Sequence, residues 1–532
     1  MTSRTLTLKR PCENRPGGSP FVLPYHSPFG PALQAFTRSF PVICLVLSLF
    51  LPATAAGQQA KAKANAKTKA QTKKAAEVPT PPFHADAPAT PARPNILFIY
   101  TDDQAPWTMG CYGRTDTLTP NLNRLAAGGM RFDNAFTTTP VCSPSRAGLI
   151  SSLYSTQVKI RDWLNPSVEP NDGLAPATIT WPELLKSNGY KTFLAGKWHL
   201  GLLDQFHPRR SGFDQFFGFR GGGNSPLNPA LENEEGITAR LEGNLANMMT
   251  DHTLQFIRQN KDNTWLAALH FREPHAPYVP TAPEDLQAVS KLEIKLPDYP
   301  GLPLERVEKL RRDYLAAVHA VDRNVGRVLD LLDELKLNDD TLVIFTSDHG
   351  YMIGEHGLHH KGNASWMASG HTGPRPNMFD YAIRVPLLVR QPGRIAAGST
   401  SKRTLTQLDI YPTILSWMGL ALPPNLKLQG RDASVILQTG SAEGWDDTYF
   451  GQYDMKHYKE AHMRTLRRPD WKLIRHLEPG ESDELYDLKN DPEETRNLAS
   501  DDNHKTIRHE LNDELVRRMK AIDDPLAGQA GK

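Results

Sequence analysis

Polar and ionisable residues follow four short apolar runs of this chain, each directly after the run ends. The runs cover residues 95–100, 191–195, 265–269 and 341–345. The polar groups that follow them are Asp102 and Asp103, Lys197 and His199, His275, and Asp348 and His349. Together they offer carboxylates for a cation, ammonium groups for an anion and imidazoles for proton transfer. This combination suits metal-assisted chemistry on an anionic substrate.

The predicted strands and helices around these polar groups indicate that the groups lie close together in the fold. Each run has the length and apolar composition of a buried strand, and helical patterns at 121–127, 181–187 and 306–335 lie between them. Strands alternating with helices indicate an α/β sandwich with a largely parallel central sheet. In open sheets of this kind, ligands bind outside the carboxyl ends of the strands, so the polar groups should share one crevice.

Asp102, Asp103 and Asp348 would then place three carboxylates side by side. Like charges that close cannot all stay ionised without a cation. Carboxylates with an amide or imidazole suit a hard ion, Ca²⁺ or Mg²⁺. For Asp102-Asp103 or Asp348-His349 alone, a helix cap or a turn is the alternative, because Asp favours such positions. Two such pairs, each at a strand end, favour the metal site.

Two lysines and two histidines are candidates for work on the substrate. Lys197 and Lys361 could supply positive charge to an anionic substrate and its transition state. His199 and His275 could move protons near neutral pH. Taken singly, each lysine also fits a solvated surface position and each histidine a structural role.

Cys142 begins the run Cys-Ser-Pro-Ser-Arg, ahead of a small-residue helix start. From its type alone, Cys142 could be a small buried hydrophobe or a thiolate nucleophile paired with a histidine. Arg146, four residues on, could return to the face of Cys142 in the first helical turn and stabilise an anionic nucleophile there. Cys111 is the one disulfide partner left outside the predicted leader, so no disulfide framework is expected.

The first 93 residues are predicted to lie outside the folded part. Arg38, the apolar run 42–51 and the small-residue site 53–55 predict a signal peptide with an extended basic region over 1–56; a buried hydrophobic segment is the alternative. Residues 57–93, rich in Ala, Lys and Pro, predict a disordered linker. We therefore expect an exported protein, periplasmic or extracellular, that is not an integral membrane protein.

Composition limits the partners. Hydrophobic residues make up 39% and charged residues 23% of the chain, as in ordinary soluble globular proteins. The net charge of +2 gives no case for a nucleic-acid partner, since the basic excess lies in the Lys-rich segment 61–74.

The C-terminal part differs from the rest: short alternating strands at 447–450, 461–466 and 471–474 precede a last helix near 507–522. This pattern predicts a catalytic domain over 94–430 and a small α+β subdomain over 431–532.

The motifs, in their order, resemble those of the type I, formylglycine-dependent sulfatases of the alkaline phosphatase-like superfamily. Residues 142–149 resemble the first sulfatase signature and residues 189–201 the second. Further matches, in the family's order, are Asp102-Asp103, Pro274-His275-Ala276-Pro277, Ser347-Asp348-His349-Gly350, Arg384-Val385-Pro386-Leu387 and Leu485-Tyr486-Asp487-Leu488. The resemblance covers about residues 94 to 520 and implies an alkaline-phosphatase-like sandwich.

The resemblance also implies a division of roles. A formylglycine-generating enzyme would oxidise Cys142 to formylglycine (3-oxoalanine), whose hydrate becomes the nucleophile. One Ca²⁺ per subunit, rather than Mg²⁺, would be bound by Asp102, Asp103, Asp348, His349 and the modified residue 142. Arg146 and His199 would hold the hydrate, Lys197 and Lys361 would clasp the sulfate, and His275 would protonate the leaving alcohol. Many relatives have Asn at the position of His349, and an imidazole is a less typical Ca²⁺ ligand.

We thus expect a secreted sulfatase that acts on a sulfate monoester, on a sulfated carbohydrate or another sulfated small molecule. An aryl or choline sulfatase and a phosphate or phosphonate monoester hydrolase of the same superfamily are the alternatives. A non-catalytic glycan-binding protein would have no need of the whole set of site residues. The segments 356–360 and 362–376 are the expected rims of the substrate site.

Overall fold

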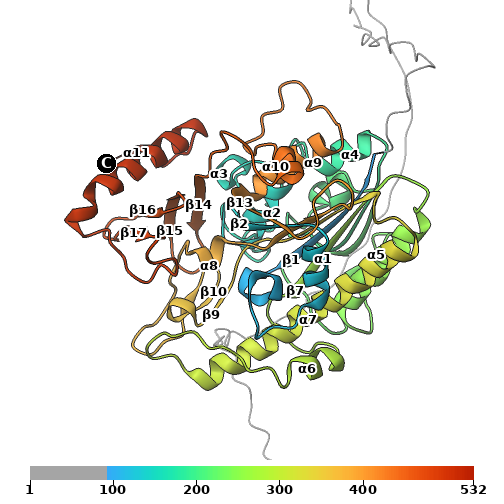
Figure 1. Cartoon of the computed structure of the whole chain (residues 1–532), viewed down its shortest axis with the longest axis horizontal. Coiled ribbons are helices and arrows are strands. Elements are labelled where there is room, and N and C mark those ends of the chain that lie inside the picture. The colour runs from blue at the N-terminus through green and yellow to red at the C-terminus, as the bar shows by residue number, and fades with distance from the viewer. Residues whose placement is uncertain (1–92, 532) are drawn as a thin grey trace, which may run out of the picture. The chain divides into compact units, whose positions relative to one another are not determined.

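The computed structural model of the protein describes residues 93–531 (Figure 1). The predicted signal peptide (1–56) and linker (57–93), apart from its last residue, lie outside the described residues. Within the described part, no helix has both the length and the apolar character that crossing a membrane requires.

A ten-stranded sheet forms the centre of this part, in the order β13-β2-β12-β8-β1-β7-β3-β4-β5-β6. Its middle is the parallel set β8 (Thr341–Ser347), β1 (Asn95–Asp102), β7 (Trp265–Pro274) and β3 (Lys191–Lys197). The other strands are β2 (Met130–Phe136), β4 (Gln215–Phe219), β5 (Ala230–Glu232), β6 (Thr238–Arg240), β12 (Leu387–Arg390) and β13 (Ser399–Thr406). The four predicted strands are therefore neighbours, and the predicted parallel arrangement is confirmed.

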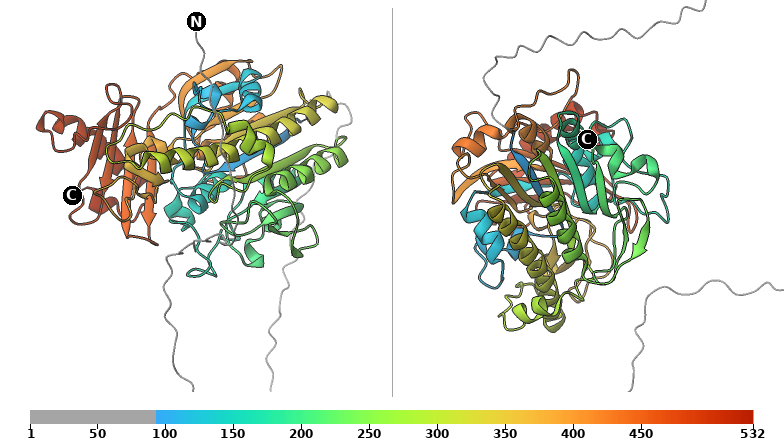
Figure 2. Two further views of the ribbon diagram at one scale, coloured as in Figure 1. Left: turned by 90° about the horizontal axis from the view of Figure 1, so that it is seen from below. Right: turned by 90° about the vertical axis from the view of Figure 1, so that its right-hand side faces the viewer.

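Side chains of a strand alternate between the two faces of the sheet, and helices cover both faces of its central strands. Leu97 and Ile99 of β1 pack in a cluster with α1 (Pro120–Ala127), α5 (Leu245–Gln259) and α7 (Leu304–Glu334). Ile96 and Phe98 pack on the opposite face with α2 (Cys142–Ser151), α4 (Trp181–Ser187) and α9 (Ile410–Trp417). The result is the three-layer α/β sandwich seen from two further sides in Figure 2.

A second, antiparallel sheet forms the C-terminal part. It consists of β14 (Tyr449–Met455), β15 (Ala461–Arg467), β16 (Trp471–His476) and β17 (Glu484–Asp487). One face is covered by α11 (Lys505–Ala521), through Leu466 and Leu473 against Leu511 and Leu515. The predicted α+β character of this part is confirmed; the boundary at residue 430 stays a prediction.

The remaining elements are short. A three-stranded sheet of β9 (Met352–Ile353), β10 (Leu358–His360) and β11 (Ser365–Trp366) follows β8. The short helices are α3 (Ser155–Val158), α6 (Pro283–Val289), α8 (Asp380–Ile383), α10 (Ser434–Thr439) and α12 (Ala527–Ala530).

Candidate active site

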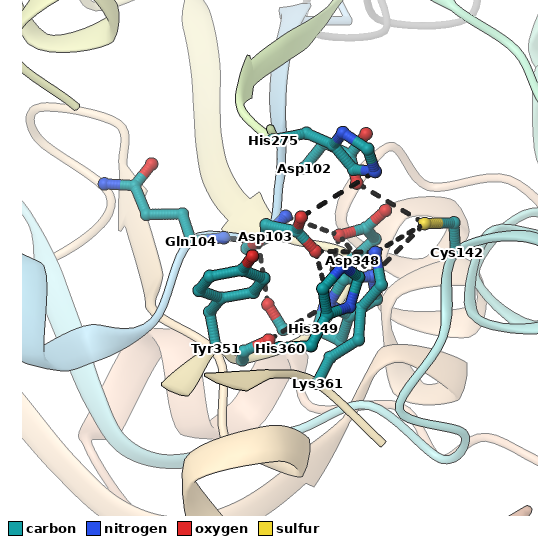
Figure 3. A network of polar contacts seen from close by, with 12 residues as sticks. Asp102, Asp103, Gln104, Cys142, His275, Asp348, His349, Tyr351, His360 and Lys361 are labelled. Carbon is teal, nitrogen blue, oxygen red and sulfur yellow. Dashed lines mark hydrogen bonds and ion pairs between the residues drawn. The ribbon is translucent and has the colours of Figure 1, made fainter. Parts of the chain in front are cut away.

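The predicted site residues come together at the carboxyl ends of β1, β8, β3 and β7. Figure 3 shows seven of them: Asp102, Asp103, Cys142, His275, Asp348, His349 and Lys361. Asp102 is the last residue of β1, and Asp103 follows with a left-handed backbone (φ 69°). This turn directs the backbone N–H of Asp103 to Oδ1 of Asp348, 3.1 Å away, just past the parallel neighbour β8. A hydrogen bond thus joins the residues that follow the two strand ends.

Three fully buried carboxylates lie in this cluster: Asp102, Asp103 and Asp348. Ligand atoms of Asp102, Cys142, Asp348 and His349 lie within 4.8 Å of one another, as do those of Asp102, Asp103 and His275. Oδ2 of Asp103 is buried without a hydrogen-bond partner among the described residues. Buried carboxylates with an unused oxygen fit a hard divalent cation, and the donor set therefore fits the implied Ca²⁺.

His349 presents Nε2 to this cluster. Its Nδ1 lies 3.1 Å from the carbonyl oxygen of Gly350, which assigns the ring proton to Nδ1. Burial lowers the pKa of His349 to about 3, so the ring is neutral. Nε2 then keeps its lone pair, 3.3 Å from Oδ1 of Asp348 and 3.4 Å from Sγ of Cys142. A neutral imidazole in this orientation can serve as a metal ligand.

Each carboxylate contacts one cationic side chain. Lys197 lies 2.5 Å from Asp102, Lys361 lies 2.7 Å from Asp103, and Arg146 lies 3.0 Å from Asp348. Burial alone would raise the pKa of Asp102, but Lys197 and the other neighbouring positive charges hold that pKa well below its usual range. Burial and the charge of Asp102 raise the pKa of Asp348.

Cys142 is the first residue of α2 and is 3% exposed. Burial, followed by the charge of Asp102, raises the pKa of its thiol to about 12. The thiol is therefore protonated near neutral pH, which counts against the thiolate alternative, since the thiolate is the nucleophile. Cys142 and Cys111 are both free.

Arg146 contacts the carboxylate cluster through Asp348. Its guanidinium lies over the ring of Tyr100, 4.9 Å from the ring centroid, and donates to Oδ2 of Asp348 and to the carbonyl oxygen of Lys197. Within residues 93–531, its polar contacts are with these groups and not with Cys142. Arg146 is thus bound to Asp348, and its predicted approach to the face of Cys142 stays a prediction.

The two predicted proton carriers have different partners. His199, in a left-handed conformation (φ 60°), directs Nε2 to the carbonyl oxygen of Leu164 at 3.1 Å. His275 directs Nε2 toward Oδ2 of Asp103 at 3.8 Å, and its side chain is 22% exposed. Burial lowers the pKa of both rings well below the ordinary value, so both are neutral near pH 7.

A cavity of about 430 Å³ opens above Cys142. Its lining combines His199, His275 and Lys361 with residues that the motifs did not identify. Those are Val141, Trp163, Leu164, Pro166, Gly221, Gly222, Gly223, His360, Asn363 and Tyr458. The run of three glycines was a usable signal, because such a run leaves space beside the backbone. Of the two expected rims, His360 and Asn363 line this cavity; the rest of both segments does not.

Two family models match nearly the whole described part. Residues 94–420 match the model described as Sulfatase, and residues 374–521 match the one described as N-sulphoglucosamine sulphohydrolase, C-terminal.

The chain belongs to the sulfatase family.

Curated sulfatases and a solved structure agree with this assignment. The chain is 27% identical to the N-acetylglucosamine-6-O-sulfatase of Bacteroides thetaiotaomicron, over 81% of this chain and 87% of the relative. It is 30% identical to the human N-acetylgalactosamine-6-sulfatase, over 66% of this chain and 67% of the relative. A structure solved in complex with its substrate D-glucosamine-2-N,6-O-disulfate has a TM-score of 0.70 and 26% identity, over 81% of this chain and 98% of the other. This sulfatase is accordingly a sulfuric ester hydrolase.

Proposed function

We propose that this sulfatase hydrolyses a sulfate monoester of a sulfated sugar, with formylglycine derived from Cys142 as nucleophile and one bound Ca²⁺. The observation that carries the proposal is the position of Sγ of Cys142 at the floor of the cavity. It lies 3.1 Å from Nζ of Lys361, 3.4 Å from Nε2 of His349 and 3.5 Å from Oδ1 of Asp102. An attacking atom at this position is in contact with a cation and with two of the proposed metal ligands.

The proposed nucleophile requires maturation of the chain. A formylglycine-generating enzyme would oxidise Cys142, and we propose that the protein is exported, as the segment 38–55 predicts. As a hydrate, formylglycine supplies one hydroxyl that attacks sulfur and a second hydroxyl. Deprotonation of the second hydroxyl would re-form the aldehyde and expel the sulfate from the first. The buried, protonated thiol of Cys142 offers neither, which supports the conversion.

Asp102, Asp103, Asp348 and His349 would hold the Ca²⁺. The ion would lower the pKa of the attacking hydroxyl and compensate the charge of the sulfate oxygens. Lys197 and Lys361 now neutralise Asp102 and Asp103. Once these carboxylates bind a cation, both ammonium groups can turn to the sulfate, whose charge they would stabilise in the transition state.

His275 would donate the proton that the leaving sugar oxygen needs. Its Nδ1 lies 2.7 Å from the carbonyl oxygen of Ala276, which orients the ring and leaves Nε2 facing the carboxylate cluster. The ring is neutral in the free protein because of burial. The negative charge of a bound sulfate ester would raise its pKa and allow it to carry the proton.

The sugar part of the proposal rests on the relatives, whose names specify sulfated amino sugars. Two measurements test it. Mass spectrometry of the peptide with residue 142, from active protein of the native host, should find formylglycine; an unmodified thiol would contradict the mechanism. Matched N-acetylglucosamine 6-sulfate and 6-phosphate should differ in kcat/KM in favour of the sulfate; a preference for the phosphate would support the phosphoesterase alternative.

A further inference from the structure

A loop of the C-terminal sheet forms part of the wall of the active-site cavity. Residues 456–460 connect β14 and β15 and contact the segment 162–169 of the catalytic part. The carboxylate of Asp162, 3% exposed, accepts the backbone N–H groups of Lys456 (2.7 Å) and His457 (3.4 Å). Nε2 of His457 lies 2.9 Å from the carbonyl oxygen of Trp163.

This contact brings two aromatic rings into one wall. Trp163 and Tyr458 both line the cavity, with ring centroids 6.4 Å apart and planes inclined by 30°. Tyr458 is 62% exposed, so the packing of the free protein leaves most of this ring uncovered. An exposed aromatic ring beside a cavity offers a flat apolar face to a ligand.

The aromatic wall has a fixed position relative to the reacting centre. The backbone N–H of Leu164, next to Trp163, donates to Oγ of Ser143, the neighbour of Cys142, at 2.9 Å. The carbonyl oxygen of Leu164 accepts from His199 at 3.1 Å. The wall is thus held by hydrogen bonds to Ser143 and His199, and it lines the same cavity as Cys142, so a substrate with its sulfate at Cys142 can reach these rings.

The charges around the cavity limit what this substrate carries besides its sulfate. Among the lining residues, Lys361 alone is permanently positive, and it lies at the floor. The lysines of the 456–460 loop are paired: Lys456 with Glu169 (2.8 Å) and Lys459 with Glu481 (2.6 Å). Among the described residues that line the cavity, no permanently positive side chain besides Lys361 is therefore available to compensate a second anionic group on the ring.

We propose that Trp163 and Tyr458 form a subsite that stacks on the face of a sugar ring bearing a single sulfate and no other charge. The C–H face of the ring would cover the exposed ring of Tyr458, and the sulfate would reach Lys361. Asp162 is a positioning residue that holds the two rings together. This inference rests on the proposed function and names the substrate class more closely.

The test compares Tyr458→Ala, Tyr458→Phe and the loop control Lys459→Ala in the full-length, matured enzyme. The probes are N-acetylglucosamine 6-sulfate, glucosamine N,6-disulfate and phenyl sulfate as substrates, and inorganic sulfate as inhibitor. Tyr458→Ala should raise KM for the singly sulfated sugar about tenfold with little change in kcat, because stacking away from the reacting atoms is uniform binding. Tyr458→Phe should restore the wild-type KM, and inhibition by sulfate should stay the same in all variants.

Four results would overturn the inference. An unchanged KM for the sugar sulfate in Tyr458→Ala would show that Tyr458 does not bind the sugar. A rise for phenyl sulfate alone identifies an aromatic leaving group instead. If Tyr458→Ala weakens inhibition by inorganic sulfate as much as it weakens binding of the sugar sulfate, the role of Tyr458 is merely structural. A lower wild-type KM for the disulfate than for N-acetylglucosamine 6-sulfate contradicts a ring without a second charge. Wild-type enzyme inactive on every sulfate ester would instead count against the proposed function, which separates the two failures.

Discussion

The ammonium group of Lys361 lies 3.1 Å from the sulfur of Cys142 and 2.7 Å from Oδ1 of Asp103. Cys142 begins a helix on one side of the central sheet, whereas Lys361 follows β10 of the small sheet after β8. The contact therefore joins a reacting atom, a charge for an anionic substrate and a carboxylate of the proposed metal site across 219 residues.

Lys361→Ala should lower kcat about 100-fold or more, because it removes a buried cation from the developing charge of the substrate. Steady-state kinetics on a sugar sulfate measure the loss. Lys459→Ala, which removes a cation from the 456–460 loop instead, is the control and should behave as wild type. Activity of Lys361→Ala within a few-fold of wild type would show that Lys361 does not contact the sulfate.

Removal of the metal should lower both activity and thermal stability. Asp102, Asp103 and Asp348 are buried together, and a cation that binds only the folded state at 100 times its Kd adds about 2.7 kcal/mol to the free energy of unfolding. We expect chelation to lower Tm and Ca²⁺ to restore it more effectively than Mg²⁺.

Asp103→Asn should reduce the rise in Tm that Ca²⁺ produces, since it removes one charged ligand. The matched control is Asp330→Asn, whose side chain is 70% exposed on α7. A calcium effect on Tm that is the same in wild type and in Asp103→Asn would contradict the assigned ligand set.

Gly222→Ala should disturb His199. A Cβ atom at Gly222 would lie 2.5 Å from Cε1 of His199, so the ring has to move away from its contact with Leu164. We expect kcat/KM to fall about tenfold or more, in line with the cost of misplacing a group at the reacting centre. Gly223→Ala, whose Cβ meets no atom within 4 Å, should lose less. Equal losses of kcat/KM in the two variants would show that the effect does not act through His199.

The C-terminal sheet should become less stable as the pH rises above neutrality. The hydrogen bond and charge of Asp454, 2.8 Å away, raise the pKa of His462 above its ordinary 6.5. A raised folded-state pKa stabilises the fold below the unfolded value, and this contribution is lost as pH rises through the folded value. Tm should therefore fall as the pH rises from 6.5 through the raised pKa of folded His462, and His462→Gln should flatten that change. An equal pH dependence in the variant would exclude His462 as its source.

The sequence was sufficient for the parts of the molecule that depend on local pattern. Continuous apolar runs predicted the four central strands because a strand buried on both faces needs apolar side chains throughout. The position of Asp102 and Asp348 directly after two of those strands then predicted their proximity, because parallel strands present their carboxyl ends at the same edge. The thiol's protonated state could not be predicted, since its pKa depends on burial among residues distant in the chain.

Only the tertiary structure brought Trp163 and Tyr458 to the same wall. Trp163 lies between α3 and α4, Tyr458 lies between β14 and β15, and the two share no motif or spacing. The loop that carries Tyr458 is held near Trp163 by Asp162, which accepts its backbone N–H groups. The tertiary structure likewise placed the guanidinium of Arg146 3.0 Å from the buried carboxylate of Asp348, a contact between residues 202 positions apart. The chemistry of this protein thus follows from short segments of sequence, whereas the shape and charge that select its substrate follow from how distant segments pack.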